Sequence, residues 1–155
     1  MRRSEKEIKD KSVIEDVFRQ ALVCRLGLCL DGLPYVVPMN FGYEENTFYF
    51  HGALQGKKMD IIRSNPNACI EMDMPLKLKE APDACFWGMN YKSVIGFGKA
   101  IILENLEEKR NGLKIIMAHY SDKSFEFDDK FLSATAVIKV EIESMTGKQS
   151  GEETS

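Results

Sequence analysis

The sequence predicts a mainly β fold: a six-stranded antiparallel split β-barrel with peripheral helices, formed by one domain over residues 1–155. Three observations lead to this prediction. Runs of β-branched and aromatic residues recur along the chain, Gly-, Asn- and Asp-containing turns separate them, and Pro38 interrupts one run. Because proline has no N–H for a sheet ladder, Pro38 requires a sheet edge or a gap, and a partly split barrel provides one.

The stretch 34–66 organises the chain and predicts two strands followed by a helix. In the first strand alternate side chains share one face, which carries Tyr35, Val37, Met39, Phe41 and Tyr43. Glu45 and Asn46 provide a turn. Residues 47–51 form the second strand, with Phe48 and Phe50 on one side and His51 on the other. We expect a helix from Gly56 to Asn65, because Pro66 disfavours helical geometry in the residue before it.

The remaining elements follow from the same patterns. The apolar run 22–30 and the turn signal at Asp31 and Gly32 predict antiparallel pairing with the strand that begins at Tyr35. Further strands are expected at 68–72, 86–105 and 135–144, with a surface loop at 73–84 and a helix at 106–120. Residues 1–20 are expected to be an N-terminal helical segment and 148–155 a frayed tail.

Composition excludes several classes of partner. A net charge of −3 gives no basic surface for nucleic acid. No apolar run is long enough to span a membrane, and no hydrophobic segment follows the basic start, so we expect a cytoplasmic protein. The four cysteines have no metal-ligand spacing, and no metal site is predicted. We interpret them as small apolar residues in a reducing compartment, with a redox or metal role as the alternative.

The helix start at Gly56, Lys57 and Lys58 lacks a Ser, Thr, Asp or Asn cap. Its first amide N–H groups are therefore without side-chain acceptors, and two lysines add positive charge where the helix dipole is already positive. A bound anion, phosphate above all, would relieve both problems. The alternative is that both lysines are solvated on a poorly capped helix.

Three segments carry a resemblance to a known family: GLPYVVPMNFGYEENTFYFHGALQGKKMDIIRSNP, YKSVIGFGKA and SMTGKQ. In this order they resemble the pyridoxamine 5′-phosphate oxidase-like family, whose fold is an FMN-binding split barrel. More narrowly they resemble its nitroimidazole-resistance branch, in which an Arg-rich start, FHGA and GKK recur together. Val37 and Gly42 stand where the oxidases proper carry Arg and Lys, so vitamin B6 oxidation is not expected.

The resemblance implies a homodimer that holds FMN at the subunit interface. The segments expected to contact the isoalloxazine ring and the ribityl chain comprise Val37, Pro38, Met39, Asn40, Phe50, His51, Gly52 and Ala53. Gly56, Lys57 and Lys58 are expected to take the phosphate, and Ser93 and Val94 to add a further contact. Arg2 and Arg3 are either a solvated tip or a contact to a ligand or partner subunit.

His51 is the candidate catalytic residue, because an imidazole titrates near neutral pH and can donate a proton or a hydrogen bond to a substrate. The alternative is a structural histidine. The first functional hypothesis is therefore an FMN-dependent oxidoreductase, reducing nitroimidazoles or other small aromatic substrates with electrons from NAD(P)H or another donor. The second is a flavin- or haem-binding storage or sensor protein without turnover. The third is a dimeric scaffold without a cofactor.

Overall fold

The protein is represented by a computed structural model, which describes residues 3–151 without the side chains of Pro75 and Leu76. Its strands are β1 (Glu7–Ile8), β2 (Cys24–Leu30), β3 (Leu33–Met39), β4 (Phe41–Glu44), β5 (Thr47–Gly52), β6 (Asn67–Lys79), β7 (Gly88–Leu103) and β8 (Ala136–Ser150). Its helices are α1 (Lys11–Gln20), α2 (Lys57–Ser64), α3 (Leu106–Tyr120) and α4 (Asp129–Ala134), with 3-10 turns η1 (Ser4–Lys6) and η2 (Ala84–Phe86).

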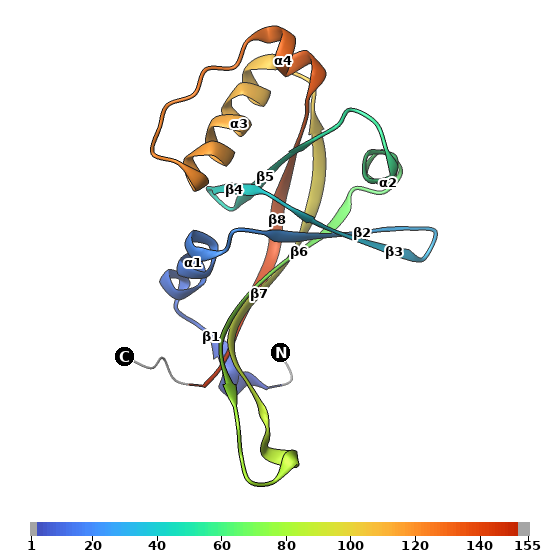
Figure 1. Cartoon of the computed structure of the whole chain (residues 1–155). Coiled ribbons are helices and arrows are strands. Elements are labelled where there is room, and N and C mark those ends of the chain that lie inside the picture. The colour runs from blue at the N-terminus through green and yellow to red at the C-terminus, as the bar shows by residue number, and fades with distance from the viewer. Residues whose placement is uncertain (1–2, 152–155) are drawn as a thin grey trace.

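The strands form one antiparallel sheet in the order β3-β2-β6-β7-β8-β5-β4, with β1 beside β8. The two edges of this order, β3 and β4, are consecutive in the chain and are separated by Asn40 alone. The sheet therefore curls round until its edges are joined through one residue, which makes it a split barrel (Figure 1). The predicted fold class is confirmed, and Pro38 lies in an edge strand, where its missing N–H costs no ladder bond.

The sheet has eight strands where six were predicted. The run 35–43 was expected to be one strand, but it divides at Asn40 because its two halves pair with different neighbours, β2 and β5. The short strand β1 is the second addition. The two predicted hairpins are present, and their turns place Asp31, Gly32, Glu45 and Asn46 at positive φ.

The prediction of a surface loop at 73–84 is wrong over its first half. Strand β6 continues to Lys79 and pairs with β7 as far as the pair Lys79 and Gly88. The ladder shifts register between Pro75 and Lys77, so the proline is accommodated in an irregularity of the strand. Together β6 and β7 form a long hairpin arm that extends away from the barrel (Figure 1).

Both ends of the chain carry more sheet than predicted. The N-terminal segment is helical in α1 only, which begins at Lys11 after Asp10 caps it by accepting from Ser12 N–H at 2.9 Å. Before it, Glu7 in β1 pairs with Lys148. Lys148 also pairs with Ser93 of β7, so β8 continues to Ser150 where a frayed tail was expected from residue 148.

Two apolar clusters hold the fold together. The inner cluster fills the barrel, and its largest fully buried side chains include Phe41, Phe48 and Phe50, with Phe18 of α1 closing one side. The outer cluster lies under α3 and α4 and contains Leu103, Leu113, Ile116, Leu132 and Val137. Both faces of β8 are therefore covered at this level, which explains why Val137 and Ile138 are both fully buried.

Helix α3 matches the prediction for 106–120, and α2 is one residue shorter at each end than the helix expected over 56–65. Helix α4 was not predicted from the sequence. Its first turn is capped by the side chain of Asp128, which accepts a hydrogen bond from Phe131 N–H at 2.6 Å. The buried ammonium of Lys109 donates to the carbonyl oxygens of Leu132 and Thr135 and so joins α3 to the end of α4. No helix within residues 3–151 is long and apolar enough to cross a membrane.

Candidate functional site

The loop between β5 and α2 brings a strand end and a helix start together. Strand β5 ends at Gly52, and α2 begins after Gly56, whose φ of 119° is a conformation that glycine tolerates and other residues avoid. Gly56 offers no side chain to cap the helix. The first amides of α2 therefore lack a side-chain acceptor, as the sequence predicted.

Lys58 points from this helix start into the fold. Its ammonium is half-buried, and its hydrogen-bond partner within residues 3–151 is the thioether sulfur of Met39, with 3.3 Å between Nζ and Sδ. Burial lowers the pKa of Lys58 below its usual value. A Cβ on Gly52 would lie 3.0 Å from Nζ, so the glycine leaves room for the ammonium. A thioether is only a weak hydrogen-bond acceptor, so this ammonium can still donate strong hydrogen bonds to an anion.

Lys57 points elsewhere. Its Nζ lies over the ring of Tyr35, 5.1 Å from the ring centroid, and the side chain is exposed. It also lines a cavity that is otherwise formed by Leu30, Asp31, Leu33, Asp60 and Ile61. The two lysines expected to share one phosphate therefore lie on different sides of the helix start.

His51 lies near the end of β5, opposite Val137 of β8, and it is exposed at the surface. Partial burial lowers the pKa of its imidazole below 6.5, and the positive charge of Lys58 lowers that pKa further. The ring is therefore neutral at pH 7, and in that form it donates one hydrogen bond and accepts another.

The segment of β3 that was expected to follow the flavin ring lies at the open edge of the barrel. Met39 is buried and Val37 half-buried, with both side chains packed in the inner cluster. Pro38 and Asn40 are exposed. Met39 thus links this edge to Lys58, and the structure brings His51, Gly52 and Lys58 close to the edge strand.

The other predicted contacts lie differently. The side chains of Phe50 and Val94 are fully buried in the core, so a ligand could meet only their backbone. Ser93 pairs with Asp73 and Lys148 near the hairpin arm. His51 and Leu103 of β7 both pair with Val137 of β8, so they lie at the same level of the sheet. Leu103 is ten positions from Ser93, which places Ser93 roughly 30 Å away along β7. Within one chain, Ser93 and His51 therefore do not share a site.

Ala53 is exposed in the loop before α2. Arg3 is exposed next to η1. Arg2 lies outside the described residues.

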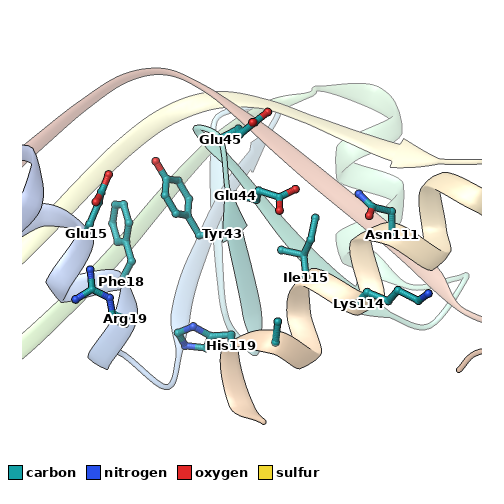
Figure 2. Close-up of a pocket in the computed structure, with 11 residues that line it drawn as sticks. Glu15, Phe18, Arg19, Tyr43, Glu44, Glu45, Asn111, Lys114, Ile115 and His119 are labelled. Atoms are coloured by element: carbon teal, nitrogen blue, oxygen red, sulfur yellow. The ribbon is translucent and has the colours of Figure 1, made fainter. Parts of the chain in front are cut away.

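A separate pocket of about 630 Å³ lies between α1, α3 and the turn after β4 (Figure 2). Phe18 and Tyr43 face it from α1 and β4, and His119 faces it from the end of α3. None of the predicted cofactor contacts lines it. Sequence reasoning assigned no function to His119, and the only signal available was a His-Tyr pair at a helix end.

Comparisons with known proteins identify the family. The model of the pyridoxamine 5′-phosphate oxidase family matches residues 10–149. The chain belongs to this family. A candidate 5-nitroimidazole antibiotic resistance protein of Bacteroides thetaiotaomicron is 40% identical in sequence; the match covers 92% of this chain and 85% of that one, with a TM-score of 0.83. The resemblance drawn from the sequence motifs is confirmed.

More distant structures share the fold. The flavocytochrome Anf3 of Azotobacter vinelandii matches with a TM-score of 0.86 at 20% sequence identity. The match covers 98% of this chain and 72% of the flavocytochrome chain. An FAD and heme binding protein of Mycobacterium smegmatis has a TM-score of 0.86 at 18% identity, covering 95% and 74%. A curated but uncharacterized protein of Rhizobium meliloti is 34% identical over 50 residues, a match that spans 32% of each chain.

The arrangement of Lys58 beside His51 predicts how the histidine titrates. Replacing Lys58 with methionine removes the nearby positive charge, so we expect the pKa of His51 to rise toward 6.5. Nuclear magnetic resonance of the His51 ring measures this pKa. Lys57→Met is the matched control and should leave it unchanged, since Lys57 lies over Tyr35. Equal shifts in both variants would contradict the geometry.

Proposed function

We propose that the protein binds FMN and uses it as an oxidoreductase, with the phosphate held at the start of α2. The observation that carries this proposal is Lys58, a half-buried ammonium beside an uncapped helix start, with a thioether as its partner among residues 3–151. Anions bind at such places because free amides, the helix dipole and a side-chain cation all favour negative charge. The residues present therefore fit the phosphate of a flavin mononucleotide.

The remaining residues fit the rest of the cofactor. Gly52 and Ala53 give the loop beside Lys58 a low profile, suited to the ribityl chain. The edge at Pro38 and Asn40 offers exposed polar backbone to the flat, hydrogen-bonding ring. Bound there, the flavin would supply the electron transfer, and the protein would supply binding, orientation and electrostatics. The similarity at 40% identity to a candidate 5-nitroimidazole antibiotic resistance protein supports a nitroimidazole as the substrate class. NAD(P)H is the electron source proposed for this reaction.

A homodimer would complete this site. Ser93 was expected to contact the same cofactor as His51, and the strand register separates the two within one chain. An exposed apolar row on the outside of the sheet supports a second copy as partner. Val36, Ile95 and Phe97 are 63%, 40% and 55% exposed, and Val36 lies level with Phe97 across β2 and β6. Patches of this kind commonly mark protein interfaces.

A flavin- or haem-binding protein without turnover is the second candidate. In this candidate His51 would be the residue to ligate the iron, because a histidine nitrogen is a common ligand of haem iron. A Soret band in the spectrum of the purified protein would support this candidate, whereas flavin bands would support the first.

Phosphate binding is tested by comparing two flavins. Lys58→Ala should weaken FMN binding about 10- to 100-fold, because a hydrogen bond to a charged group contributes about 1.5–3 kcal/mol. Riboflavin, which lacks the phosphate, should bind the variant as it binds the wild type. Fluorescence titration measures both affinities. Lys57→Ala should have the smaller effect on FMN, and an unchanged FMN affinity in Lys58→Ala would remove the phosphate assignment.

The role of His51 is tested by turnover. His51→Ala should keep FMN bound but slow NAD(P)H oxidation with a 5-nitroimidazole about 100-fold, the usual contribution of a positioned proton donor. His51→Gln keeps an N–H donor and should lose less. If the wild-type ring must be protonated, its rate rises as the pH falls below 6.5, since the pKa of His51 is lowered. Equal rates in all three proteins would make His51 structural, and no turnover by flavin-loaded wild type would favour the second candidate.

The dimer is tested at the apolar row. Phe97→Glu places a charge on this face and should convert the dimer to a monomer in light-scattering measurements, with weaker FMN binding. Phe131→Glu is the matched control, because Phe131 is 47% exposed on α4, away from the row. A monomeric wild-type protein that binds FMN would refute the shared site.

A further inference from the structure

The hydroxyl of Tyr120, the last residue of α3, bridges two backbone segments that are distant in sequence. It accepts a hydrogen bond from Phe41 N–H at 3.0 Å and donates one to the carbonyl oxygen of Leu22 at 2.9 Å. Leu22 lies between α1 and β2, and Phe41 is the first residue of β4. One side chain therefore connects the segments that enter β2 and β4.

This bridge lies at the split of the barrel. Met39 is the last residue of β3 to pair, with Cys24, and Phe41 is the first of β4 to pair, with Phe50. Asn40 lies between them, outside either strand. Because β3 and β4 are the two sheet edges, no shared ladder holds them together. The Tyr120 hydroxyl provides a hydrogen bond on the β4 side of the split, one residue from Asn40.

Neighbouring contacts fix α3 in place. The His119 ring lies 4.5 Å from the Phe41 ring, centroid to centroid, and its Nε2 is 2.7 Å from the carbonyl oxygen of Ala21. A Cβ on Gly42 would lie 2.6 Å from the backbone of Ile115, so glycine is needed for β4 to pack this closely on α3. The end of α3 thus holds residues 21–22 and 41–42 in one arrangement.

We propose that Tyr120 is a positioning residue for the flavin ring: its hydroxyl holds the backbone at Met39 and Asn40 in the geometry that receives the ring edge. This inference rests on the proposed function. Tyr120 touches Phe41 and Leu22 and acts through them. Without the hydroxyl, Phe41 N–H and Leu22 C=O lose their partner, and the segment at Asn40 populates other arrangements that bind the ring less well.

The test uses Tyr120→Phe, which keeps the ring and removes only the hydroxyl. We expect faster amide hydrogen exchange at Phe41 and a changed visible circular dichroism spectrum of the bound flavin. We also expect the affinities for FMN and for riboflavin to fall by the same factor, about fivefold. One hydrogen bond contributes modestly to the binding geometry, and the ring is common to both ligands. Lys58→Ala should instead weaken FMN alone.

Tyr49→Phe is the matched control. Tyr49 is half-buried under α3 and packs against the same outer cluster as Tyr120, but its hydroxyl makes neither of the hydrogen bonds to Phe41 and Leu22, so this variant should change none of these measurements. Unchanged affinities and an unchanged spectrum in folded Tyr120→Phe would overturn the proposal, even with faster exchange at Phe41. Weakening of FMN alone would also overturn it, since that pattern belongs to the phosphate site. Wild-type protein that binds neither flavin would remove the proposed function itself, whereas flavin binding by wild type with an unaffected Tyr120→Phe removes only this inference.

Discussion

The one-residue connection at Asn40 between the edge strands β3 and β4 is the constraint on which the rest of the structure depends. A sheet whose first and last strands are consecutive in the chain must curl round on itself, and the single residue between them leaves no length for a detour. The two edges cannot share a ladder at that point, because Pro38 lacks an N–H and the chain changes neighbours there. The barrel therefore has a split, and polar backbone is exposed beside it.

The helix start after β5 places positive charge next to this split. Lys58 reaches back from α2 to Met39 of the edge strand, so the cation and the split belong to one surface. Partial burial lowers the pKa of the His51 imidazole, and the charge of Lys58 lowers that pKa further, because a nearby cation disfavours a second one. An anion bound there would offset the charge of Lys58 and make His51 easier to protonate. Cofactor binding and the protonation of the candidate catalytic group would thus be coupled.

The long strands β6 and β7 explain why one chain holds only part of the proposed site. They continue beyond the barrel as an arm, which carries Ser93 away from His51. The exposed apolar row of Val36 on β3 and Ile95 and Phe97 on β7 would give a second copy a place to pack. A dimer would use the arm and the row together, and the proposed cofactor site would then depend on assembly.

The sequence by itself determined the features that are local to a few residues. Positive φ at Asp31 and Gly32, the alternation of Phe48 and Phe50, the uncapped start at Gly56 and the edge position required by Pro38 all follow from backbone preferences and side-chain chemistry. Only the tertiary structure decided the rest. The extension of β6 to Lys79, the different partners of Lys57 and Lys58, and the bridge made by Tyr120 each depend on which distant segment lies alongside, and no local pattern encodes that.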